Sequence, residues 1–101
     1  GATNVNNISM ETPNDYELGQ NYPNPFNPST NIIYKILKSS DVRINVMDVL
    51  GRRIQTIVNQ KHSPGTYQIS FDGNSLPSGI YFYQLIVDNK IVQTRRMALI
   101  K

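Results

Sequence analysis

Three prolines alternate with asparagines in the stretch Tyr22-Pro23-Asn24-Pro25-Phe26-Asn27-Pro28-Ser29-Thr30. Each proline fixes its own φ near about −65° and lacks a backbone donor, and it pushes the preceding residue toward extended geometry. Neither a helix nor a central strand can form from such a stretch. We therefore predict a rigid, extended edge segment that closes a β-domain, with Tyr22 and Phe26 packed against the strands that follow. A polyproline II ligand for an aromatic groove is the alternative, although no basic residue adjoins the stretch.

Length and composition restrict the classes of protein that this chain can belong to. Its 101 residues suit one domain, and its net charge of +3 is small and dispersed along the chain. Nucleic-acid-binding domains usually carry a denser basic stripe with interleaved aromatics. The chain has no cysteine, which excludes disulfides, cysteine-ligated zinc and a thiol nucleophile.

The start of the chain differs in pattern from the rest. Residues 1–15 are rich in Asn and Thr and show no periodicity, so we predict a flexible linker there and a folded domain over residues 16–101. Tyr16–Leu18 is expected to be a short first strand. The longest apolar run is too short to span a membrane. No secretory signal peptide opens the sequence, so an exported protein would have to extend beyond it.

Alternating or β-branched segments follow the proline-rich stretch. We expect strands over residues 31–37, 42–49, 53–58, 66–71, 80–87 and 90–100, with a surface loop over residues 59–65. The run from Ile80 to Val87 is the most hydrophobic and is predicted to be a central strand, buried on both faces or nearly so. No segment has a sustained helical period. About seven short strands with regularly spaced turns predict an all-β, Ig-like antiparallel β-sandwich.

A tyrosine near the start of the penultimate strand supports this architecture. Tyr81 follows Leu76-Pro77-Ser78-Gly79-Ile80, as in the tyrosine corner of Ig-like sandwiches. Its hydroxyl is expected to bond to backbone a few residues upstream. The cysteine pair and core tryptophan of antibody domains are missing.

Residues that could carry catalysis are few. His62 is the only histidine and has no thiol or second imidazole to join, so we predict a solvated loop residue. The later acidic residues precede or occupy predicted turns, where their carboxylates would cap local amides; they are Asp41, Asp48, Asp72 and Asp88. Asp72-Gly73-Asn74 faintly resembles a calcium loop but lacks the further ligands. We therefore predict no enzyme activity, metal or cofactor.

Two groups of residues could instead bind a partner. The aromatics could form a sugar-stacking platform, although at strand spacing they are more often core pairs; they are Tyr34, Tyr67, Tyr81, Phe82 and Tyr83. Four cations lie within the last dozen residues: Lys90, Arg95, Arg96 and Lys101. They could protect an edge strand from aggregation, or present a basic-apolar strand to a receptor by β-augmentation.

Several ordered motifs resemble the type A C-terminal sorting domain of the type IX secretion system, found in Gram-negative bacteria of the Bacteroidetes. The similarity covers about residues 16–101. It rests on the motif Pro23-Asn24-Pro25-Phe26-Asn27-Pro28, on Asp48 and Gly51 of Asp-x-x-Gly-Arg, on Gly79 and Tyr81 of Leu-Pro-Ser-Gly-x-Tyr, and on the basic final strand. The Asp-x-x-Gly-Arg and Ser-Gly-x-Tyr parts are also similar to the Ig-like domain of flagellar hook-capping proteins.

The resemblance implies a non-catalytic module at the end of a larger secreted cargo protein. It implies passage through the periplasm, recognition by an outer-membrane translocon and removal by a sortase-like peptidase that cuts within Gly1–Tyr16. The cargo would then reach the cell surface or the medium. The proline-rich motif and the last strand would form the receptor surface. The alternative is an Ig-like accessory module, either carbohydrate-binding or a spacer, of an extracellular glycoside hydrolase.

Overall fold

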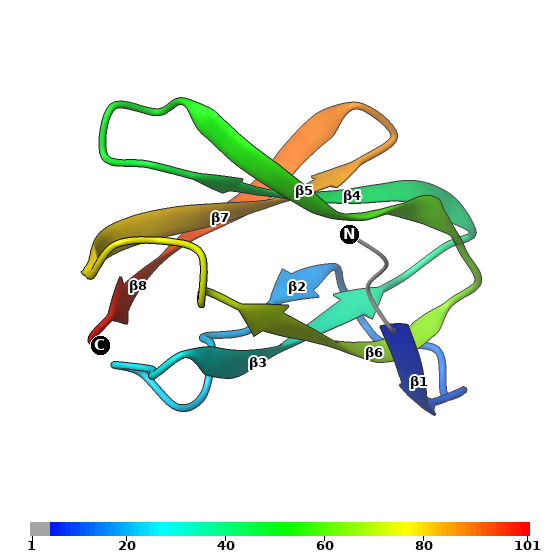
Figure 1. The fold of residues 1–101 in the computed structure, drawn as a ribbon. Helices are drawn as coiled ribbons and strands as arrows, with labels where there is room; N and C mark the ends of the chain where they lie inside the picture. Colours follow the sequence, from blue (N-terminus) through cyan, green and yellow to red (C-terminus); the bar gives the residue numbers. More distant parts are fainter. Residues whose placement is uncertain (1–4) are drawn as a thin grey trace.

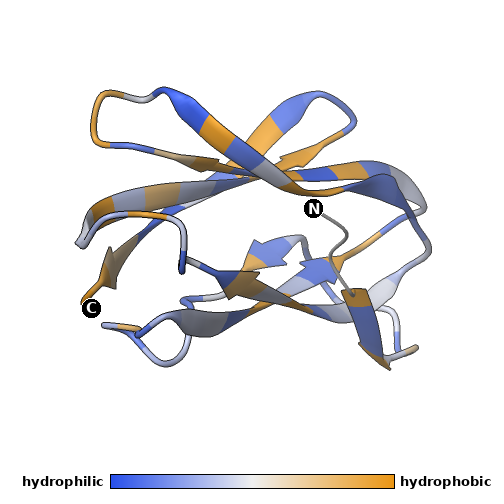
Figure 2. Ribbon diagram, in the orientation of Figure 1, coloured by the Kyte–Doolittle hydropathy of each residue, from blue (hydrophilic) through white to orange (hydrophobic). Residues whose placement is uncertain are grey.

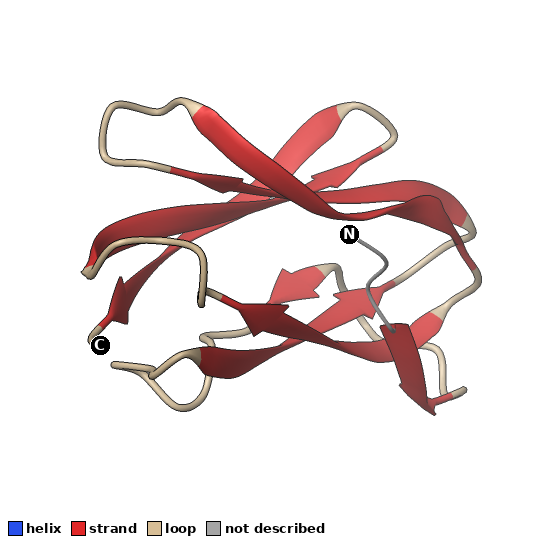
Figure 3. Ribbon diagram, in the orientation of Figure 1, coloured by secondary structure: helices blue, strands red, loops and turns tan. Residues whose placement is uncertain are grey.

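Alternation of apolar and polar side chains produces eight strands in the computed structural model, which describes residues 5–101 (Figures 1 and 3). No residue in that range is helical. The strands are β1 (Val5–Ser9), β2 (Glu17–Leu18), β3 (Ser29–Ile36), β4 (Ser40–Met47), β5 (Arg53–His62), β6 (Gly65–Asp72), β7 (Gly79–Val87) and β8 (Lys90–Leu99). Among the described residues, no helix is long and apolar enough to cross a bilayer.

The strands form two sheets of four strands each, packed face to face as a sandwich (Figure 1). The first sheet has the order β1-β6-β3-β2, the second has the order β5-β4-β7-β8, and all pairs are antiparallel. Alternate residues of each strand point into the space between the sheets, as in β4, where Val42, Ile44 and Val46 are buried. The all-β antiparallel sandwich predicted from the sequence is confirmed.

The leader contains a strand that the sequence does not signal. We predicted a linker over residues 1–15, but Val5–Ser9 forms β1 and pairs with β6, with Val5 opposite Ile69. Val5 also packs against the core. β1 lies at the edge of its sheet, and Val5 is its apolar contact with the core, so most of its residues are polar. Its sequence therefore lacks the alternation of apolar and polar residues that indicates a strand. The linker prediction is wrong for residues 5–9, and residues 1–4 lie outside the described part.

The predicted loop over residues 59–65 is mostly strand. β5 continues to His62, with Gln60 opposite Val42 and Lys61 opposite Asp41, and β6 begins at Gly65. The run Asn59–Lys61 is exposed. As β5 lies at the edge of its sheet, polar side chains are tolerated there, and backbone pairing with β4 maintains the strand.

The hydrophobic strand β7 is central, between β4 and β8, as predicted. Only Leu85, Ile86 and Val87 are buried in succession; Gly79 and Ile80 are exposed, and residues 81–84 alternate between buried and half-buried. Burial on both faces is therefore wrong for most of the strand, because nothing in residues 5–101 covers the outer side of this sheet (Figure 1).

The tyrosine corner is present. The Tyr81 hydroxyl donates to the carbonyl oxygen of Pro77 at 2.6 Å. The Tyr67 hydroxyl donates to Ser63 O, also four residues upstream and at 2.6 Å. Each bond ties the loop that precedes a strand to that strand, so these hydroxyls fix how β6 and β7 begin.

We expect Tyr81→Phe to lower the free energy of unfolding by about 1 kcal/mol, because one hydrogen bond is lost while the buried ring stays in place. Urea denaturation measures this difference. Tyr22→Phe is the matched control: its ring is 80% exposed. It should change stability by less than about 0.5 kcal/mol. Equal effects of the two substitutions would show that the corner bond contributes nothing.

Candidate functional site

The proline-rich segment crosses from one sheet to the other. Tyr22 pairs antiparallel with Asn31 of β3, and four residues later Phe26 pairs in parallel with Leu99 of β8. The chain bends between these bridges, and the peptide bonds that precede Pro23, Pro25 and Pro28 are all cis. The predicted extended crossing is therefore wrong in shape, whereas its place at an edge is confirmed.

This segment closes the C-terminal half of the β8 edge. Phe26 N donates to Ala98 O and Ile100 N donates to Phe26 O, both at 2.9 Å. Ala98 N donates to the side-chain oxygen Asn24 Oδ1 at 3.0 Å. An open edge would leave these backbone groups available to any other strand. The motif therefore satisfies the edge of the last strand from within the same chain.

The Phe26 ring anchors the segment. It is 1% exposed and meets the ring of Phe71 edge-on at a centroid distance of 6.0 Å. A Cβ placed on Gly73 would lie 3.0 Å from Leu99 Cδ2 and 3.2 Å from Phe26 Cε2, so a larger residue there would require these side chains to shift slightly. Tyr22, the other predicted apolar contact, is 80% exposed, and its predicted packing is wrong.

A buried polar network holds the start of the segment, and sequence reasoning missed it. Asn21 Nδ2 donates to Thr30 Oγ1 at 3.0 Å and to Pro23 O at 3.2 Å, and Thr30 Oγ1 donates to Pro23 O at 2.8 Å. Asn21 N donates to the Tyr83 hydroxyl, which donates to Gly19 O, each at 2.7 Å. The polar residues that flank the prolines were the only available signal.

Burial extends the pH range over which Tyr83 stays protonated. Desolvation raises the pKa of its hydroxyl from 10.0 to about 12, so the hydroxyl remains a donor well into the alkaline range. The network is therefore neutral and fully hydrogen-bonded, which is the condition under which buried polar groups stabilise a fold.

Residues of β8 also form hydrogen bonds with the residues just before the motif. Arg95 Nε donates to Leu18 O at 3.0 Å, and Leu18 N donates to Gln93 Oε1 at 3.2 Å. Gln20 Nε2 donates to Arg96 O at 2.7 Å. Contacts therefore run along β8 from Gln93 to Ile100, so the segment from Leu18 to Phe26 acts as one clasp on this edge. We call residues 18–26 the edge clasp.

The four predicted signal cations do not form one patch. Lys90 is exposed at the β7–β8 turn, at the opposite end of β8 from Lys101. Arg95 is half-buried on the edge clasp, whereas Arg96 is exposed opposite Phe82. Lys101 bonds through Nζ to Asn74 O and through its backbone nitrogen to Ser78 Oγ. Three of the four are therefore exposed to a partner at separate places.

The Asp48 turn forms as the sequence predicts. Asp48 Oδ1 accepts from Leu50 N at 2.9 Å and from Arg52 N at 3.0 Å, and Oδ2 accepts from Arg52 Nε at 2.8 Å. These hydrogen bonds lower the pKa of the Asp48 carboxyl, and the bond from the backbone N–H of Arg52 has the largest effect. Gly51 has φ +79°, a conformation that favours glycine. Asp48 and Gly51 therefore have structural roles.

Two other carboxylates also accept from backbone amides. Asp72 Oδ1 accepts from the local Asn74 N at 2.9 Å, as predicted. Asp88 Oδ1 accepts from Asp41 N at 2.9 Å, on a distant strand, so the predicted local cap is wrong for Asp88. Gly79 is exposed and has no atom close to the position of an added Cβ. In the described part of the chain, no three His, Cys, Asp or Glu side chains gather to hold a metal ion.

His62 is not a solvated loop residue, so that prediction is wrong. It is 4% exposed, its Nε2 lies 2.6 Å from the Tyr34 hydroxyl, and its ring stacks on Tyr67 with centroids 4.1 Å apart. Desolvation lowers the pKa of His62 and raises that of Tyr34. The imidazole is buried because β5 extends to this position, which local composition did not indicate.

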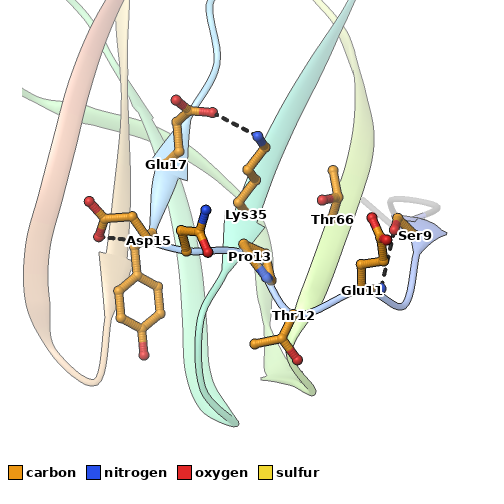
Figure 4. Close-up of a pocket in the computed structure, with 10 residues that line it drawn as sticks. Ser9, Glu11, Thr12, Pro13, Asp15, Glu17, Lys35 and Thr66 are labelled. Atoms are coloured by element: carbon orange, nitrogen blue, oxygen red, sulfur yellow. Dashed lines mark hydrogen bonds and ion pairs between the residues drawn. The ribbon is translucent and has the colours of Figure 1, made fainter.

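The sugar-platform interpretation is also wrong. Tyr34, Tyr67, Tyr81 and Tyr83 are all buried, and Phe82 is half-buried, so the alternative interpretation as core pairs is confirmed for the four tyrosines. The hollow in Figure 4 is open and polar, and it lies along the loop between β1 and β2. Its lining includes Glu11, Asp15 and the ion pair of Glu17 with Lys35 at 3.5 Å.

The chain matches the model of a known protein family. The family model described as secretion system C-terminal sorting domain matches residues 20–100, which is most of the chain and includes the motif, the Asp48 turn, the tyrosine corner and β8. No curated protein sequence is similar enough to the chain to count as a match.

We expect Phe26→Ala to lower the free energy of unfolding by about 3–5 kcal/mol, because it empties a buried site beneath the edge clasp. Tyr22→Ala, an exposed aromatic of the same segment, should cost less than about 0.5 kcal/mol. Urea denaturation compares the two. A small loss for Phe26→Ala would contradict the anchoring role of this ring.

The buried His62 should make the domain less stable in mild acid. Its pKa is lower in the folded than in the unfolded state, so the unfolded chain binds more protons and stability rises with pH. We expect the free energy of unfolding to fall between about pH 7.5 and about pH 5.5, above the range of ordinary carboxylates. His62→Phe, which keeps a ring on Tyr67, should flatten this dependence. An unchanged slope would assign it to other groups.

Proposed function

Because this chain belongs to the family of secretion system C-terminal sorting domains, we propose that it directs a cargo protein across the outer membrane through the type IX translocon. The cargo is an N-terminal part of the same polypeptide, and the domain itself performs no catalysis. The route passes through the periplasm and ends at the cell surface or in the medium.

The observation that supports this proposal most strongly is the edge clasp. The family motif at Asn24 and Phe26 is bonded to Ala98 and Ile100, so the start and the end of the family match meet in space. A signal that depends on these contacts exists only in the folded domain. We propose that the translocon recognises the assembled sandwich and its final strand.

The motif residues divide into two groups under this proposal. Asn24, Phe26, Asp48, Gly51 and Tyr81 build the shape of the domain. The exposed Pro23, Pro25 and Asn27, with Gly79 and the cations Lys90, Arg96 and Lys101, are available to a receptor. Arg95 belongs to the first group, because its guanidinium is bonded to Leu18 O.

We propose that the sortase-like peptidase cuts the chain in the loop between β1 and β2. Residues 10–15 have no strand partner, and all of them except the half-buried Pro13 are exposed. A peptidase needs an extended substrate that is free of sheet pairing. Cleavage there leaves β1 on the cargo side and the sandwich from Tyr16 onward on the other.

An export assay tests the proposal. A signal peptide and a fluorescent reporter precede residues 1–101 in a host with a working type IX system and in its translocon-deficient mutant. We expect the reporter on the surface or in the medium of the first strain only, with a new C-terminus within residues 10–15. Retention in the periplasm of both strains would contradict the sorting function.

Deleting Arg95–Lys101 is a poor test of the signal, because the deletion also removes the buried Met97 and Leu99. Replacing Lys90, Arg96 and Lys101 by glutamine retains the core. We expect this variant to fold and to lose most of its export. Export at the unaltered level would exclude the terminal cations as the recognised feature.

A further inference from the structure

The outer face of the sheet β5-β4-β7-β8 carries an unusual row of side chains. Arg96 of β8 lies opposite Phe82 of β7, Phe82 lies opposite Met47 of β4, and Met47 lies opposite Arg53 of β5. Their neighbours in β4, β7 and β8 are the buried Val46, Tyr81, Tyr83 and Met97, so these strands direct the row outward. We call Arg96, Phe82, Met47 and Arg53 the outer row; it spans about 14 Å.

The outer row has a polar border on one side and an apolar border on the other. The next row holds two side-chain hydrogen bonds, Gln84 Nε2 to Thr94 Oγ1 at 3.1 Å and Thr56 Oγ1 to Asn45 Oδ1 at 2.8 Å. On the other side, Ile80 is 38% exposed opposite Ala98.

The turn between β4 and β5 extends the apolar surface. Val49 and Leu50 are 65% and 74% exposed. Figure 2 shows a hydrophobic stretch at this turn, followed by a hydrophilic stretch where β5 begins. The charged turn residues Asp48 and Arg52 bond to each other, and the Arg52 side chain remains 74% exposed beside this surface.

The other sheet differs on its outer face. Its outward cross-strand pairs are Asn31 with Ser70, Ile33 with Gln68, and Lys35 with Thr66. The exposed isoleucines of this sheet are Ile33 and Ile8, and scattered exposed apolar residues are ordinary on a solvent-exposed sheet. The juxtaposition of Phe and Met with arginines is therefore a property of one face, and the fold does not require it.

Composition and charge indicate a protein partner. Phe, Met and Arg are enriched in the buried centres of protein interfaces, and Asp, Glu and Lys are depleted there. Arg43, Asn45 and Met47 point outward from β4, and neither they nor their cross-strand partners in β7 and β8 include a carboxylate. The charged residues of this face are instead the cations Arg43, Arg53 and Arg96. A complementary surface has an apolar centre with carboxylates on both sides.

We propose that the outer row is the docking face for a protein of the export machinery that presents carboxylates around an apolar patch. This inference rests on the proposed sorting function and assigns its receptor contact to a sheet face. Met47, Arg53 and Phe82 lie outside the terminal strand. A receptor that reads only the chain end as an extended peptide would not detect them.

Export of the reporter fusion tests this docking face with Arg53→Glu and Phe82→Thr. We expect each variant to reduce surface reporter by roughly tenfold, as expected for residues central to an interface. Arg53→Lys should retain export. Matched controls away from the face are Lys38→Glu, with the same change of charge, and Ile33→Thr on the other sheet; both should be exported normally.

Folding and contact are measured separately. Arg53 is exposed, so purified Arg53→Glu should melt close to the unaltered domain, and lost export then reports recognition. A photo-cross-linking residue at position 53 should link to an outer-membrane component of the translocon, and one at position 38 should not.

The outcomes are distinguishable. Normal export of Arg53→Glu and Phe82→Thr, with the unaltered domain exported only when the translocon is present, overturns the docking face and leaves the sorting function standing. If the unaltered domain is not exported, both proposals fail. Equal cross-linking from positions 53 and 38 also contradicts a specific face.

Discussion

The structure depends on the closure of one sheet edge. The final strand of the chain would expose its backbone along the whole of one side, and residues 18–26 occupy that side from Gln93 to Ile100. Asn24 and Phe26 provide three hydrogen bonds, each with a net contribution of about 1 kcal/mol, and the buried Phe26 ring adds about 2–3 kcal/mol. Prolines on either side of Phe26 lack backbone donors, so the edge clasp does not itself become a strong new edge.

This arrangement gives a physical reason for motifs that lie far apart in the sequence. The proline-rich motif, the Asp48 turn, the tyrosine corner and the basic strand all contribute to one sandwich, and the side chains of Asn24, Phe26, Asp48, Tyr81 and Arg95 bond or pack within it. A motif that builds a shape is not necessarily the surface that a partner contacts. The outer row is an example of this distinction. Its residues lie on the outer face of the sheet and not in the core, and their composition suits a protein partner.

Sequence reasoning predicted the features with local causes. The strands from β3 to β8, the Asp48 turn and the hydroxyl bond of Tyr81 follow from alternation, from a capping carboxylate with glycine, and from a short motif. Features with distant causes were missed. β1 is a strand because β6 offers an edge, His62 is buried because β5 extends beyond its apolar part, and Asn21 is buried because Tyr83 and Thr30 complete its bonds. β6 lies far from β1 in the sequence and Tyr83 far from Asn21, whereas Thr30 lies on the other side of the same prolines as Asn21.

The most direct test of the closed edge is amide hydrogen exchange, measured residue by residue by NMR. The account predicts that the amides of Phe26, Ala98 and Ile100 exchange as slowly as amides in the central strands β4 and β7, because each is hydrogen-bonded across the β8 edge. Exchange of Ala98 and Ile100 at rates typical of an open edge, with β4 and β7 still protected, would show that the edge clasp does not close the sandwich.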